Sequence, residues 1–103
     1  MVDQELNELR REFLAESAAK VREMEKGVDG GRSPESIERV TYLAHQLKGS
    51  GGSYGFERIS AEAAEVEKTA ERLLGGDEAV LESVRKHVAN LRDEIEKQAE
   101  ALR

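Results

Sequence analysis

The most informative stretch of the chain is residues 33–56, which read SPESIERVTYLAHQLKGSGGSYGF. Its first two residues, Ser33 and Pro34, are typical of a helix start, with a capping serine and then proline at the first helical position. Apolar residues then recur at steps of three and four, the spacing of one face of an α-helix. The stretch ends in GSGGSYG, where closely spaced glycines interrupt helical structure. We therefore predict a helix over about residues 34–52.

The same spacing of apolar residues occurs in three further stretches on either side of this segment. Glycine-rich breaks separate the stretches, and Asp77, after the last break, is a candidate N-terminal cap. We predict helices over about residues 3–27, 56–74 and 77–102, in addition to the one above. Apolar residues nowhere alternate with period two, so β-strands are not expected.

The connections between these segments are short, which places successive helices antiparallel. The pattern therefore predicts an all-α fold, an up-down-up-down four-helix bundle. A chain of 103 residues is long enough for one domain and too short for two, so we expect a single domain over residues 1–103. One extended coiled coil is the alternative, but three breaks at helix-length intervals favour the bundle.

Composition excludes several classes of function. The chain has no cysteine, which rules out disulfides and thiolate zinc sites. A net charge of −6 argues against binding nucleic acid through its phosphates, which requires clustered Lys and Arg. No apolar run approaches the roughly 20 residues of a membrane span, and the charged N-terminus is unlike a secretory signal. We expect a cytoplasmic protein that binds neither nucleic acid nor membrane.

His45 lies on an unusual face of the predicted second helix. At about 100° per residue, the core direction of this helix runs through Val40, Leu47 and Gly51. His45 points roughly 140° away from that direction, which predicts a solvent-facing side chain. A histidine that is merely buried among core residues is therefore disfavoured, whereas an ordinary surface histidine also fits the pattern.

The neighbours of His45 on the helix add to this picture. Thr41, Lys48, Gly49 and Gly52 share its face. Each glycine inside a helix costs about 1 kcal/mol relative to alanine. Two glycines on an outer face are explained if another molecule must approach the backbone beside the histidine, so we predict partner access over Thr41, Gly49 and Gly52. The alternative is that the helix frays at Gly49.

The string HQLKGS at 45–50 is followed by Gly52, Tyr54, Gly55 and Phe56. These residues resemble the signature of histidine-containing phosphotransfer (HPt) domains, and they look closest to the variant at the N-terminus of chemotaxis-type histidine kinases. Two other segments resemble the motifs of the family's first and third helices: FLAES at 13–17, and Val66 with Glu67. Helix order and length agree, so the resemblance covers nearly the whole chain.

The resemblance implies a role for four residues. His45 would accept a phosphoryl group on Nε2, and Lys48 would lie near the phosphate oxygens as a compact cation. Gly49 would leave room for the partner's active site. Glu67 would accept a hydrogen bond from Nδ1–H of the histidine, which leaves the Nε2 lone pair free to attack phosphorus. Helical geometry alone is also compatible with Glu67 as an ordinary surface glutamate.

The function implied is a phosphorelay carrier, not an enzyme, acting between a histidine kinase or receiver domain and a response-regulator aspartate. The receiver would supply the acceptor aspartate and Mg²⁺, so we expect no resident cofactor, and we expect a monomer. Two histidines without a carboxylate cluster do not suggest a metal site, so we interpret His87 as structural. Two alternatives stay open: a purely structural interaction or dimerisation module, and the substrate domain of a larger chemotaxis-type kinase.

Overall fold

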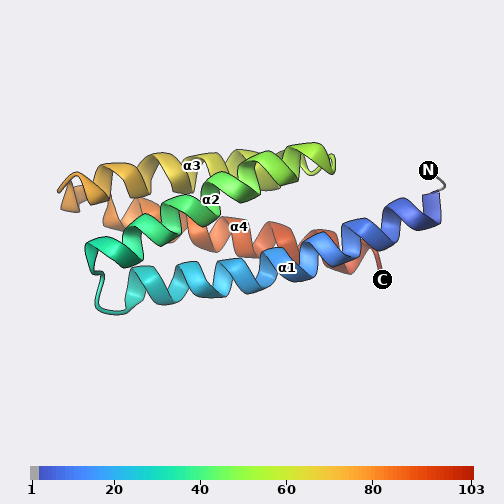
Figure 1. The fold of residues 1–103 in the computed structure, drawn as a ribbon, viewed down its shortest axis with the longest axis horizontal. Helices are drawn as coiled ribbons and strands as arrows, with labels where there is room; N and C mark the ends of the chain where they lie inside the picture. The colour runs from blue at the N-terminus through green and yellow to red at the C-terminus, as the bar shows by residue number, and fades with distance from the viewer. Residues whose placement is uncertain (1–2) are drawn as a thin grey trace.

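The chain folds into an antiparallel bundle of four helices (Figure 1). The computed structural model describes residues 3–103. The elements are α1 (Asp3–Asp29), α2 (Pro34–Ser53), α3 (Glu57–Leu74), the 3₁₀ turn η1 (Glu78–Val80) and α4 (Leu81–Ala101). Successive helices pack side by side and α4 returns to α1, in a molecule 47 Å long and 19 Å across. The predicted four-helix bundle is confirmed, and the extended coiled coil is wrong.

The predicted apolar stripes meet along the axis of the bundle. Every helix contributes fully buried side chains to one continuous core, for example Leu14, Met24, Leu47, Val66 and Leu91. Burial of one such side chain contributes about 1.5–3 kcal/mol. The outer faces are largely charged, and among residues 3–103 no helix has the length and apolarity needed to cross a bilayer.

The first helix is longer than the sequence suggests. It continues through Gly27 to Asp29, two residues beyond the expected end. A Cβ atom at Gly27 would lie 3.0 Å from Cγ2 of Val40 and 3.3 Å from the carbonyl oxygen of Ser36. Gly27 therefore serves the close approach of α1 and α2, and does not end the helix. Glycine has both uses, and the sequence pattern alone did not distinguish them.

The other helix boundaries differ by smaller amounts. Helix α2 extends one residue past the expected end, and α3 begins at Glu57, one residue late. Phe56, just before α3, stacks on Phe13 with ring centroids 5.8 Å apart. The fourth segment, expected as one helix over 77–102, begins with η1 and becomes α-helical only at Leu81. Asp77 is a cap, but its carboxylate accepts from the backbone N–H of Ala79 at 3.2 Å and so favours the tighter 3₁₀ turn.

Helix α2 begins where the sequence predicts, and it does not fray at Gly49. The Ser33 hydroxyl accepts a hydrogen bond from the backbone N–H of Ser36 at 3.1 Å. The helix is continuous to Ser53, so the fraying alternative is wrong. Gly55 closes the following turn with φ of 83°, a backbone conformation that glycine adopts without strain.

Replacing Ser33 with alanine should lower the free energy of unfolding by about 1 kcal/mol, because one amide at the start of α2 loses its acceptor. Urea denaturation monitored by circular dichroism measures the difference. The matched control is Ser53→Ala at the other end of α2, where the lost hydroxyl donates only to the exposed carbonyl of Gly49. We expect the control to change stability by less than about 0.5 kcal/mol. Equal effects of the two variants would contradict the capping role.

Candidate functional site

His45 stands on the outer surface of α2, near the middle of the bundle. Its side chain is 65% exposed, while Ala44 and Leu47 on the other side of the helix are fully buried. The outward orientation predicted from helical spacing is therefore correct. A surface hollow of about 410 Å³ lies at the turn between α2 and α3, and His45 does not line it.

Glu67, on α3, holds the imidazole of His45. Its Oε2 lies 2.8 Å from Nδ1 of the histidine, and the carboxylate is only 15% exposed. A carboxylate can only accept hydrogen bonds, so Nδ1 must carry the proton. Among residues 3–103, Nε2 of His45 makes no hydrogen bond or ion pair. The contact therefore fixes the tautomer in which the Nε2 lone pair is available to an incoming electrophile.

Lys48 reaches the same carboxylate from the next turn of α2. Its Nζ lies 2.7 Å from Oε1 of Glu67, so the two oxygens of Glu67 bind Lys48 and His45 separately. The hydrogen bond from Lys48, reinforced by the one from His45, lowers the pKa of Glu67 below its ordinary value despite the opposing effect of burial. Glu67 is therefore ionised at neutral pH and remains an acceptor for His45. The family resemblance implies Lys48 as a cation near phosphate, but not its contact with Glu67.

Three glycines of α2 have different surroundings. A Cβ at Gly49 would meet no atom of residues 3–103 within 4 Å, so this position is open surface next to His45. A Cβ at Gly52 would lie 3.7 Å from the hydroxyl of Ser60, an ordinary contact. A Cβ at Gly51 would lie 3.2 Å from the backbone nitrogen of Ser60, because α2 and α3 approach closely there. Only Gly51 has a packing reason, as expected from its place on the core side.

Thr41, for which we predict partner access, lies one helical turn before His45 on α2. It is half-buried, and its hydroxyl donates to the carbonyl oxygen of Ile37 at 3.0 Å, one turn earlier in the same helix. Ser60, which sequence reasoning did not identify, donates from its hydroxyl to the carbonyl oxygen of Lys48 at 2.7 Å. This hydrogen bond joins α3 to the backbone of α2 beside the site.

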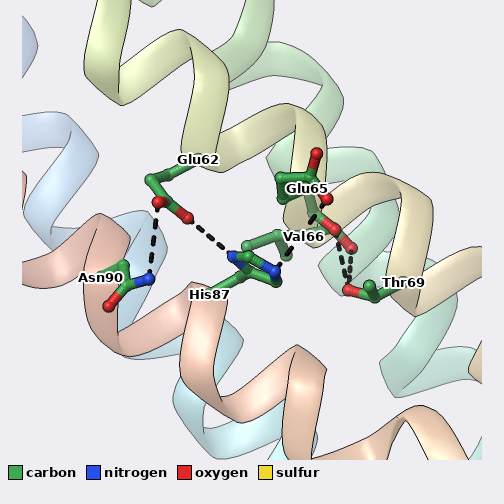
Figure 2. Close-up of polar contacts among 6 residues, drawn as sticks. All are labelled: Glu62, Glu65, Val66, Thr69, His87 and Asn90. Atoms are coloured by element: carbon green, nitrogen blue, oxygen red, sulfur yellow. Dashed lines mark hydrogen bonds and ion pairs between the residues drawn. The ribbon is translucent and has the colours of Figure 1, made fainter.

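A second histidine–glutamate pair joins α3 to α4 (Figure 2). Nδ1 of His87 lies 2.8 Å from Oε2 of Glu62, whose other oxygen accepts from the side-chain amide of Asn90 at 3.4 Å. From the sequence we interpret His87 as structural, but its spacing does not reveal these carboxylates. Finding them requires the register between α3 and α4, which a single sequence does not provide. Among residues 3–103, no group of three or more His, Asp or Glu side chains is arranged to hold a metal ion.

The two pairs share the contact at Nδ1 and differ at Nε2. Nε2 of His87 faces Oε2 of Glu65 at 4.0 Å, and the His87 side chain is only 21% exposed (Figure 2). A carboxylate in that position repels an incoming phosphoryl group and obstructs the approach of another protein. Nε2 of His45 has no such neighbour. The geometry therefore favours His45 over His87 as a surface nucleophile.

Comparisons of the sequence with known proteins identify the family of this chain. The family model described as "Hpt domain" matches residues 8–103. The chemotaxis protein CheA of Rhizobium meliloti (strain 1021) is 30% identical over 69 residues, a match that covers 63% of this chain and 9% of that protein. The matched region is thus a small part of the relative's length. No solved structure gives a significant match. Hpt domains are phosphotransfer modules of two-component systems, which work with histidine kinases and response regulators. The chain belongs to the Hpt domain family.

Proposed function

We propose that this domain carries a phosphoryl group on Nε2 of His45 between a histidine kinase or receiver domain and a response-regulator aspartate. The observation that carries the proposal is the pair formed by an exposed His45 and a mostly buried, ionised Glu67, with Nδ1 and Oε2 at 2.8 Å. The contact orients the ring and directs its lone pair to the solvent. The surface beside it, at Gly49, is open to a partner.

The transfer needs no proton from solvent. When His45 is phosphorylated, the Nε2 lone pair forms a bond to phosphorus, and the bond from phosphorus to the donor oxygen breaks with its electron pair left on that oxygen. In the second transfer a receiver carboxylate attacks phosphorus, and the electron pair of the P–N bond returns to Nε2. Glu67 accepts from Nδ1–H throughout and stabilises the positive charge that develops on the ring.

The domain contributes position and charge, and its partner contributes the remaining chemistry. Phosphoryl transfer depends mainly on alignment and on stabilisation of negative charge. Lys48 is the cation next to His45, and its half-exposed ammonium can turn from Glu67 to the phosphate oxygens. We propose that the receiver supplies the acceptor aspartate and Mg²⁺. The domain is then a phosphocarrier, and its similarity to CheA supports a chemotaxis-type kinase as donor.

Incubation with a panel of phosphorylated receivers, and with a histidine kinase and ATP, tests this function. The expected product is one phosphate per chain that is acid-labile and base-stable, read by radiolabel and by intact mass before and after acid treatment. A chain that takes up no label from any receiver, from a kinase or from a small phosphoryl donor would favour the structural interaction module instead.

Replacing Glu67 with alanine should lower the rate of phosphoryl transfer at His45 by about 10–100-fold. A hydrogen bond to a charged group is worth about 1.5–3 kcal/mol, and here it fixes the reactive tautomer. Single-turnover transfer to a receiver, at saturating receiver and neutral pH, measures the rate.

The control for Glu67→Ala is Glu62→Ala, which removes the equivalent carboxylate from His87. Both residues lie on α3, and both hold a histidine through Nδ1 at 2.8 Å. We expect Glu62→Ala to transfer at the rate of the unmodified domain. A similar loss in the two variants would mean that the effect comes from a general loosening of α3, and Glu67 would then have no specific role.

A further inference from the structure

Tyr42 is the most exposed large hydrophobic residue of the described chain, and it lies one helical turn from His45. Its side chain is 51% exposed, and only one other large hydrophobic residue among residues 3–103, Leu74 at 39%, is classed as exposed. At about 100° per residue, Tyr42, His45 and Gly49 lie within a sector of about 60° on α2. Tyr42 therefore belongs to the surface that carries the candidate phosphoacceptor.

Two contacts hold the Tyr42 side chain, one at its ring and one at its hydroxyl. The guanidinium of Arg39 lies over the ring, 5.4 Å from its centroid, and Nε of Arg39 itself donates to Oε2 of Glu23 on α1 at 2.7 Å. The side-chain amide of Gln46 donates to the Tyr42 hydroxyl at 2.9 Å. A side chain that is already ordered loses little conformational entropy when a partner covers it.

A partner that reaches His45 must also cover Tyr42. A specific protein interface buries about 800 Å² on each side, a patch roughly 30 Å across. Side chains three residues apart on a helix are only about 5–6 Å apart at Cβ, so the ring falls well inside any such patch centred on His45. Tyr and Arg are also the residue types over-represented among those that dominate binding energy.

Along α2, the surfaces before and after His45 differ in the side chains that they present. Toward the C-terminus of α2, Gly49 and Gly52 leave the backbone bare, and toward the N-terminus Tyr42 and Arg39 present an ordered ring and guanidinium. On the basis of the proposed function, we infer that Tyr42 is a specificity-determining anchor for the receiver domain. An apolar side chain of the receiver packs on the Tyr42 ring while its acceptor aspartate approaches His45 over the glycines.

The test separates docking from chemistry. The domain is first phosphorylated with phosphoramidate, a small donor that needs no docking surface, and then mixed with increasing concentrations of the panel receiver that accepts the phosphoryl group fastest. Tyr42→Ala should raise the receiver concentration at half-maximal rate by about 5–30-fold. The rate at saturating receiver, and labelling by phosphoramidate, should stay within about twofold of the unmodified domain.

Two further variants complete the experiment. Tyr42→Phe retains the ring and should stay within about threefold of the unmodified domain in half-saturating concentration. Leu74→Ala, which removes the other exposed apolar side chain at the far end of α3, should have no effect above about twofold.

Any of three results would overturn the assignment of Tyr42. The half-saturating receiver concentration could be unchanged in Tyr42→Ala, or Tyr42→Ala could lower only the rate at saturating receiver. Leu74→Ala could also raise the half-saturating concentration as much as Tyr42→Ala does. In each of these cases the unmodified domain is still labelled, so the proposed function stands. If neither phosphoramidate nor any receiver labels the unmodified domain, the proposed function fails, and the assignment of Tyr42 fails with it.

Discussion

Replacement of His45 with glutamine is expected to abolish the incorporation of acid-labile phosphate, whereas replacement of His87 leaves it unchanged. Both histidines donate from Nδ1 to a glutamate at 2.8 Å, so the carboxylate contact alone does not identify the phosphoacceptor. The difference lies at Nε2. Within residues 3–103, Nε2 of His45 has no hydrogen-bond or ion-pair partner. Nε2 of His87 faces a second carboxylate, and the His87 side chain is only 21% exposed.

The measurement is label from phosphorylated receivers, from a kinase with ATP and from phosphoramidate, counted before and after acid treatment. His45→Gln should lower the free energy of unfolding by less than about 1 kcal/mol, because an exposed histidine contributes little packing. Loss of label then cannot be attributed to unfolding. Acid-labile phosphate on His45→Gln, or its disappearance in a folded His87→Gln variant, would show that the assigned site is wrong.

Much of the fold could be predicted because it depends on local patterns. The stripe through Val40 and Leu47 specifies which face of α2 is buried, and Ser33 with Pro34 specifies where the helix starts. The sequence places the end of α1 two residues early, at Gly27, because a glycine in a helix can end it or admit a neighbouring helix, and only the distance to Val40 distinguishes these two roles.

The site was only partly predictable, because its contacts depend on the register between helices. The outward direction of His45 follows from the spacing within α2. The place of Glu67 came from the family resemblance, since spacing alone also allowed an ordinary surface residue. The hydrogen bond between Lys48 and Glu67, and the pair formed by His87 and Glu62, join residues that are 19 and 25 positions apart. No local pattern encodes which side chains meet at such separations.

Replacing Gly49 with glutamine should slow phosphotransfer from receivers while leaving the domain folded. The added side chain meets no atom of the domain within 4 Å at its Cβ, and replacing a helical glycine raises stability by up to about 1 kcal/mol. The same side chain projects into the space beside His45 that a partner must occupy. A steric conflict of about 1–3 kcal/mol corresponds to a transfer rate from receivers that is lower by about 5–150-fold. Labelling by phosphoramidate should be close to normal, because a small donor passes the obstruction.

Gly51→Leu, two residues along the same helix, should lower the stability of the domain but impair transfer from receivers less than Gly49→Gln does. A Cβ at Gly51 already lies 3.3 Å from Cγ2 of Ile59 and 3.2 Å from the backbone of Ser60, so a larger side chain must push α2 and α3 apart. We expect the free energy of unfolding to fall by about 1–3 kcal/mol or more, measured by urea denaturation. Transfer by the fraction that remains folded should be less impaired than in Gly49→Gln. Normal transfer from receivers by Gly49→Gln would mean that this glycine does not clear a path to His45, and the docking direction over Gly49 would have to be abandoned.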